Sequence, residues 1–206
     1  MIVLGLTGGV GMGKSSSARF LEERGIRVID TDVIARELVE PGQPAVAEIR
    51  AAFGPGIISV DGRLRREVLA ARVFSDPIQR GRLEGILHPR IRQKWVSQLD
   101  QFAAAGAPEV AVVIPLLFET RAESRFDYIL CAACSAETQK KRLAERGWSE
   151  LQIRQRLESQ WPIEKKIELS DFVIWTEGSL DVHAKQIERI LGEVRPRQAS
   201  PEHSRS

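Results

Sequence analysis

The chain has 206 residues, and its 30 lysines and arginines nearly balance its 28 aspartates and glutamates. This length predicts one domain with some elaboration, and a hydrophobic content of 43% is typical of a soluble protein with a packed core. The charge balance argues against a dedicated nucleic-acid-binding protein, and the two cysteines are too few for a disulfide framework. The longest apolar run, residues 110–118, is about half of a membrane span, so we expect a cytoplasmic protein that does not bind membranes.

Five short apolar runs predict the strands of a parallel sheet. They occupy residues 2–7, 26–30, 109–114, 128–133 and 172–175. Because the runs are continuous rather than alternating, we expect helices to cover both faces of the sheet. A helix over residues 15–24 follows the first strand and ends at Gly25. The pattern predicts an α/β fold.

Two excursions interrupt the alternation of strands and helices. Nearly 80 residues separate the second strand from the third, whereas a crossover needs about a dozen or somewhat more. Helical patterns at residues 33–39, 45–53, 64–73 and 78–105 predict a helical insertion there. Residues 142–166 form a second, strongly charged helical excursion before the fifth strand. Residues 195–206 lack periodicity, and we expect a disordered tail.

A phosphate-binding loop follows the first strand. Residues 8–15 match the pattern G-x-x-x-x-G-K-[ST], whose glycines allow backbone N–H groups to surround phosphates. Lys14 would reach the β- and γ-phosphates, and the Ser15 hydroxyl would bind Mg²⁺. The motif lies between a strand and a helix, which favours nucleoside triphosphate binding over a chance glycine-rich turn. We expect ATP contacts from Gly8, Gly9, Gly11, Met12, Gly13, Lys14, Ser15 and Ser16.

Three classes of phosphate-loop protein compete at this point: small-molecule kinases, GTP-binding switches, and ATPase motors. The chain contains no asparagine and so lacks the Asn-Lys-x-Asp loop of guanine-reading switches. The third predicted strand ends without the carboxylate that motors usually place there. Asp30 and Asp32 close the second strand instead, and would share one face if the strand continued. Together they could hold Mg²⁺ through water and orient an acceptor hydroxyl, although Asp32 would also suit a helix N-cap.

The second excursion supplies positive charge. Separations of three and four residues place Gln139, Arg142 and Arg146 on one helical stripe. The planar guanidinium group suits the oxygens of a transferring phosphoryl group. The position of this charged excursion beyond the fourth strand, where small kinases carry a closing lid, favours a lid over a solvated helix face. Cys131 and Cys134 would lie on opposite faces of a strand, so we expect buried thiols rather than a metal site.

The chain resembles the dephospho-coenzyme A kinase family from residue 2 to about residue 190. The resemblance is carried by Gly5 to Gly11 with Gly13-Lys14-Ser15, Ile29 to Arg36, Pro41-Gly42, Asp61-Gly62, Leu64 with Arg66, Leu87 to Ile91, Pro115 to Glu119, Phe126-Asp127, Gln139 with Arg142-Leu143 and Arg146, Gln160, Glu164-Lys165 and Ser170-Asp171. Among the positions that depart from it, Arg65 stands where Asn or Asp is common, and Thr176 stands where Asn is usual.

The resemblance implies transfer of the γ-phosphoryl group of ATP to the ribose 3′-hydroxyl of dephospho-coenzyme A, with Mg²⁺ as cofactor. It implies a three-layer core with a five-stranded parallel sheet (residues 1–31, 106–141 and 167–194), a helical acceptor domain (32–105) and a helical lid (142–166). A monomer is compatible with it.

The same resemblance assigns roles to particular residues. It implies catalytic roles for Lys14, Asp32 and Arg142, and further ATP contacts from Arg142 and Arg146. Mg²⁺ would be bound by Ser15, with Asp30 and Asp32 acting through water. Acceptor contacts are implied for Thr7, Asp32, Arg66, His88 and Leu116. The alternatives are a kinase for another small hydroxyl compound, such as a nucleoside, nucleotide or shikimate-like acceptor, and a nucleotide-dependent switch or ATPase.

Overall fold

The computed structural model describes residues 1–195, and its centre is one parallel sheet with the strand order β2-β3-β1-β4-β5. The five strands are β1 (Ile2–Gly8), β2 (Arg27–Asp30), β3 (Glu109–Val113), β4 (Tyr128–Ala133) and β5 (Phe172–Trp175). The all-parallel sheet is confirmed, and each predicted strand end lies within one residue of the observed one. The central strand β1 is paired on both sides, so its carboxyl end opens between β3 and β4.

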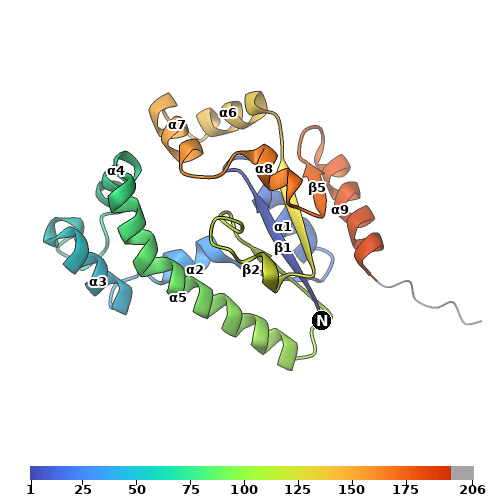
Figure 1. Ribbon diagram of the computed structural model, residues 1–206, viewed down its shortest axis with the longest axis horizontal. Coiled ribbons are helices and arrows are strands. Elements are labelled where there is room, and N and C mark those ends of the chain that lie inside the picture. The colour runs from blue at the N-terminus through green and yellow to red at the C-terminus, as the bar shows by residue number, and fades with distance from the viewer. Residues whose placement is uncertain (196–206) are drawn as a thin grey trace, which may run out of the picture.

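Helices cover both faces of the sheet, as the continuous apolar runs predict (Figure 1). One face packs against α1 (Lys14–Glu22) and α9 (Leu180–Val194), and this layer includes the fully buried Leu4 and Leu6 of β1. The other face packs against α2 (Thr31–Glu37), the second half of α5 (Pro77–Ala104) and α8 (Ile163–Glu168). Burial of both faces stabilises a sheet whose strands are mainly apolar.

The long crossover forms a helical unit with a core of its own. It contains α3 (Pro44–Phe53), the short 3-10 helix η1 (Pro55–Ile57), α4 (Arg66–Ser75) and the first half of α5. Ile49 and Ile57 are fully buried inside it. In Figure 1 these helices extend away from the sheet, and α5, 28 residues and about 42 Å long, connects the two cores.

The start of α2 corrects one sequence expectation. We expected Asp30 and Asp32 to share a face of a continuing strand, but β2 ends at Asp30 and α2 begins at Thr31. The Asp30 carboxylate accepts a hydrogen bond from the Asp32 backbone N–H at 2.8 Å, so Asp30, not Asp32, is the N-cap. The Asp32 carboxylate therefore lies in the first turn of α2 and does not cap it.

The second excursion consists of α6 (Ala136–Glu145), α7 (Glu150–Glu158) and α8. Its last helix packs on β1 and β4, and Lys166 at the predicted end of the lid is fully buried. At the other end of the chain, Arg195 is the first residue of the predicted disordered tail and forms an ion pair with Glu109. Residues 196–206 of that tail lie outside the described residues. Among residues 1–195, no helix is both long and apolar enough to cross a bilayer.

Candidate functional site

The phosphate loop joins β1 to α1 at the carboxyl edge of the sheet. Gly11 and Gly13 have φ angles of 77° and 89°, which side chains rarely adopt. At Gly8 a Cβ atom would lie 2.2 Å from the carbonyl oxygen of Ala132, so only glycine allows β1 to approach β4 this closely. Because α1 begins at Lys14, the free N–H groups of its first turn face the space above the loop.

Lys14 spans the loop that precedes it. Its Nζ atom donates hydrogen bonds to the carbonyl oxygens of Gly8 at 2.8 Å and Gly9 at 2.9 Å. Burial lowers the pKa of the ammonium group to about 8; the negative charge of Asp32 opposes this shift, and the positive charge of Lys166 adds to it. The amine is therefore held at the centre of the loop with a proton that is easily lost above neutral pH.

Asp32 lies within electrostatic reach of this amine. The residue is exposed overall, but the loss of water around its carboxyl group raises its pKa, the charge of Asp30 raises it further, and Lys14 opposes both. The buried Thr31 hydroxyl donates to the carbonyl oxygen of Val113 at 2.8 Å and so fastens the start of α2 to β3. This bond fixes the position from which Asp32 faces the phosphate loop.

The donors near the loop fit a magnesium ion. Ser15 and Asp30 line a common cavity of about 370 Å³. Hydroxyl and carboxylate oxygens, with water and substrate phosphates, are the ligands that Mg²⁺ prefers. Within residues 1–195 no cluster of three histidine, cysteine or acidic side chains forms a metal site, and both cysteines are buried. Burial raises the pKa of the Cys131 thiol to about 11, in agreement with a structural role.

Two glutamines hold the tip of the loop. The Gln139 side chain donates to the Val10 carbonyl oxygen at 2.7 Å, and Gln160 accepts from the Val10 N–H at 3.1 Å. Gln139 is on α6 and Gln160 follows α7, so both ends of the second excursion contact the phosphate loop. Glutamine amides thus satisfy the Val10 N–H and C=O groups, which have no partner in a strand or helix.

The two arginines of the predicted helical stripe differ in their contacts. Arg142 points to the end of β5, where its guanidinium group donates to the hydroxyl and the carbonyl oxygen of Thr176. Arg146 lies beyond the last residue of α6 and is exposed; among the described residues no hydrogen bond of its side chain is recorded. Arg146 is the C-cap residue of α6, and its contact with ATP stays a prediction.

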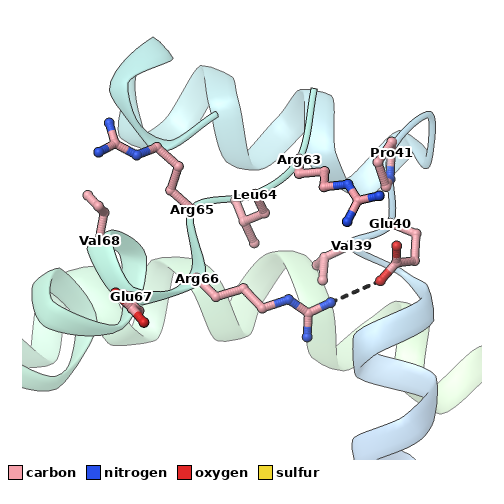
Figure 2. Close-up of a pocket in the computed structure, with 9 residues that line it drawn as sticks. All are labelled: Val39, Glu40, Pro41, Arg63, Leu64, Arg65, Arg66, Glu67 and Val68. Atoms are coloured by element: carbon pink, nitrogen blue, oxygen red, sulfur yellow. Dashed lines mark hydrogen bonds and ion pairs between the residues drawn. The ribbon is translucent and has the colours of Figure 1, made fainter. Parts of the chain in front are cut away.

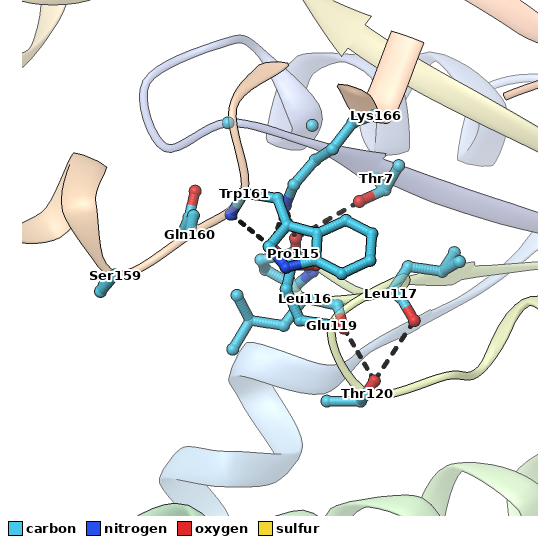
Figure 3. A network of polar contacts seen from close by, with 12 residues as sticks. Thr7, Pro115, Leu116, Leu117, Glu119, Thr120, Ser159, Gln160, Trp161 and Lys166 are labelled. Carbon is cyan, nitrogen blue, oxygen red and sulfur yellow. Dashed lines mark hydrogen bonds and ion pairs between the residues drawn. The ribbon is translucent and has the colours of Figure 1, made fainter. Parts of the chain in front are cut away.

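A buried ion pair that sequence reasoning missed lies beside the loop (Figure 3). The Nζ atom of Lys166 lies 2.7 Å from Glu119 Oε1 and donates to the Pro115 carbonyl oxygen at 2.7 Å, and the lysine side chain is fully buried. Glu119 also accepts from the Trp161 N–H at 2.9 Å, and the Thr7 hydroxyl reaches the Pro115 carbonyl oxygen at 3.3 Å. The network joins α8, the segment after α7 and the carboxyl ends of β1 and β3.

The predicted acceptor contacts fall into two places. Thr7 and Leu116 lie at the carboxyl edge of the sheet, within this network. Arg66 begins α4 and lines a cavity of about 510 Å³ with Arg63 and Arg65, where its guanidinium group pairs with Glu40 at 3.0 Å (Figure 2). His88 is half-buried within α5; like Arg66 it belongs to the helical unit. The structure therefore does not gather the predicted acceptor residues at one point. Asp32 lies in the first turn of α2, whereas the Arg66 cavity begins beyond the last turn of that helix, at Val39.

Comparison with known proteins agrees with this arrangement. A family model described as dephospho-CoA kinase matches residues 2–181. A dephospho-CoA kinase of Corynebacterium glutamicum is 40% identical over 195 residues, which span 94% of this chain and 100% of the relative. One of Anaeromyxobacter dehalogenans is 39% identical over 196 residues, which span 95% of this chain and 93% of the relative.

Solved structures show the same fold. A crystal structure of a Thermus thermophilus protein covers 95% of this chain and 98% of its own, with a TM-score of 0.79 and 33% identity. The dephospho-CoA kinase of Campylobacter jejuni covers 93% of this chain and 96% of its own; its TM-score of 0.68 at 24% identity supports the fold alone. The family model and the two curated relatives decide the assignment: this chain belongs to the dephospho-CoA kinase family.

Proposed function

We propose that this protein transfers the γ-phosphoryl group of ATP to the ribose 3′-hydroxyl of dephospho-coenzyme A. The observation that carries the proposal is the position of Asp32 across from Lys14. A carboxylate and a phosphate-binding lysine influence each other's charge at the open edge of the sheet. A carboxylate at this place can accept a hydrogen bond from an acceptor hydroxyl while Lys14 binds the phosphates of the donor.

Lys14 and Arg142 would balance the charge of the transferring group. Lys14 is held at the loop by two carbonyl oxygens, and Arg142 lies at the end of β5 beside the same loop. The planar fork of arginine suits the oxygens of a phosphoryl group as they separate from the donor. Mg²⁺, bound by Ser15 and through water by Asp30 and Asp32, would neutralise charge on the phosphates of ATP.

Asp32 would orient the acceptor hydroxyl and take its proton. A carboxylate is a weak base for an alcohol even with the raised pKa of Asp32. In the loose transition state of phosphoryl transfer the proton leaves late, so orientation of the hydroxyl is the larger contribution. The bond from Thr31 to β3 supports this role because it fixes the turn of helix that carries Asp32.

The helical unit would bind the rest of the acceptor, and we propose it as the acceptor domain. Dephospho-coenzyme A is long and carries a diphosphate beside its ribose. The seven residues of α2 span about 10 Å, and the Arg66 cavity begins just beyond them at Val39 and Glu40. An acceptor that reacts at Asp32 could therefore extend along α2 towards three arginines.

We also propose a lid that is narrower than residues 142–166. Arg142 contacts the core, and Lys166 is buried in it, so the part free to move is α7 with its flanking loops, residues 146–159. Closure of this segment would exclude water from the phosphates and limit hydrolysis of ATP. We propose further that the enzyme acts in the cytoplasm and without nucleic acid.

The test is a coupled assay of ADP formation with a panel of acceptors. Dephospho-coenzyme A should far exceed adenosine, shikimate and a control without acceptor. Asp32→Asn should lower kcat about a hundredfold or more and leave ATP binding at pH 7 nearly unchanged. A better rate with another acceptor would refute the assigned substrate, and normal turnover of Asp32→Asn would remove Asp32 from the mechanism.

A further inference from the structure

The end of β5 holds the Arg142 side chain through two hydrogen bonds. Nη1 donates to the Thr176 hydroxyl oxygen at 2.9 Å, and Nη2 donates to the Thr176 carbonyl oxygen at 2.6 Å. The guanidinium group is planar and rigid, so two bonds to one residue determine the plane in which it lies. Of its five N–H donors, three remain for a ligand.

The same hydroxyl group joins this arginine to the phosphate loop. Thr176 Oγ1 donates to the carbonyl oxygen of Met12 at 3.1 Å. A carbonyl can only accept, and a hydroxyl has a single hydrogen, so that hydrogen points to Met12 and the arginine donates to the oxygen lone pairs. Arg142 therefore donates to Thr176, and Thr176 donates to Met12, which lies two residues before Lys14.

Close packing makes this contact specific. Thr176 is 5% exposed, and a Cβ atom added at Gly13 would lie 2.9 Å from its methyl group. The backbone of Thr176 is fastened separately, since its N–H donates to the Ala133 carbonyl oxygen at 2.8 Å. The strand end thus has its own support, and the hydroxyl group is not required to form it.

We infer that Thr176 is a positioning residue for phosphoryl transfer: it holds the guanidinium group of Arg142 beside the phosphate loop before ATP binds. This inference rests on the proposed function, which gives Arg142 its role. A free arginine side chain samples many rotamers, and most of them point away from the loop. Thr176 restricts that choice, so the charge that stabilises the transferring group is already in place when the substrates arrive.

Two substitutions separate the hydroxyl group from the packing. Thr176→Val keeps the shape of the side chain but removes both hydrogen bonds of Oγ1, whereas Thr176→Ser keeps the hydroxyl and removes only a methyl group. We expect kcat for phosphoryl transfer to dephospho-coenzyme A to fall about tenfold in Thr176→Val, with a smaller change in the KM for ATP. Thr176→Ser should stay within about threefold of the unmodified protein.

A double-mutant cycle with Arg142→Ala supplies the decisive readout. If Thr176 acts through the arginine, Thr176→Val should have little further effect on kcat once Arg142 is alanine. An equal loss of kcat in both backgrounds would show a merely structural role and overturn the inference, as would normal turnover of Thr176→Val beside a slow Arg142→Ala. Thr176→Ala carries the same test if the valine variant does not fold.

The cycle also distinguishes this inference from the proposed function. Normal turnover of Arg142→Ala would overturn the role of both residues but leave phosphoryl transfer itself intact. Failure of the unmodified protein to phosphorylate dephospho-coenzyme A would instead refute the proposed function, and the positioning of Arg142 for that reaction with it.

Discussion

ATP binding should weaken above about pH 8 because Lys14 loses its proton in the free protein. Burial lowers the pKa of this amine to about 8, and a bound triphosphate favours its charged form. If only the charged form of Lys14 binds ATP, the affinity falls about tenfold between pH 7 and pH 9, which is about 1.4 kcal/mol of binding free energy. At the higher pH, Lys14 takes up about one proton when ATP binds. The phosphates of ATP are already ionised over most of this range, so they contribute little to the change.

Isothermal titration calorimetry in buffers of different ionisation enthalpy measures both the affinity and the proton uptake. Lys14→Arg is the matched control, since its guanidinium group keeps its charge and its affinity for ATP should stay flat to about pH 9.5. In Asp32→Asn the fall should begin at a lower pH, because the negative charge that opposes the shift is gone. An affinity that stays constant to about pH 9.5 in the unmodified protein would refute the reasoning.

Three further predictions concern stability and the proposed lid. Lys166→Met should lower the free energy of unfolding by about 3–5 kcal/mol, because it leaves the Glu119 carboxylate buried and unpaired. Adding Glu119→Gln should restore part of that free energy, and equal urea midpoints for the single and the double variant would contradict this. The Arg156 guanidinium carbon of α7 lies 4.4 Å from the ring centroid of Phe74 in α4 and 4.2 Å from that of Trp148, so this side chain links the proposed lid to the helical unit. Arg156→Ala should therefore speed hydrogen exchange in α7 but not in α9, and unchanged exchange in α7 would refute a stabilising role of this link. Burial lowers the pKa of His183 below its usual 6.5, so the folded state favours the neutral ring and stability should decline as the pH falls below about 6.5. The thermal midpoint of the unmodified protein should therefore fall between about pH 7 and pH 5. A midpoint that is flat over this range in the unmodified protein but not in His183→Gln would contradict this.

The features that were predictable from the sequence depend on neighbouring residues. The phosphate loop follows from glycines and a lysine at fixed spacing, and the strands follow from short apolar runs. The turn at Asp30 was misread because two acids separated by one residue suit either a strand edge or a helix start. The choice depends on the Asp30 cap and on the Thr31 bond to Val113, a residue 82 positions away.

The missed features depend on contacts between distant segments. Lys166 stands among charged residues that look like a solvated face, yet it is fully buried because Glu119 and the Pro115 carbonyl oxygen neutralise and bind its ammonium group. The one available signal was Glu119, which ends the apolar run of residues 110–118 that contains the third strand. Thr176 is similar: nothing nearby in the sequence shows that its hydroxyl group lies between Arg142 and Met12.

The position of the transferred phosphate tests the central claim most directly. The protein would be incubated with dephospho-coenzyme A and ATP labelled at the γ-phosphate, and the product examined by phosphorus nuclear magnetic resonance and mass spectrometry. The account predicts one added phosphate on the ribose 3′-oxygen, formed together with an equal amount of ADP. Label released only as inorganic phosphate, or attached elsewhere on the acceptor, would contradict it.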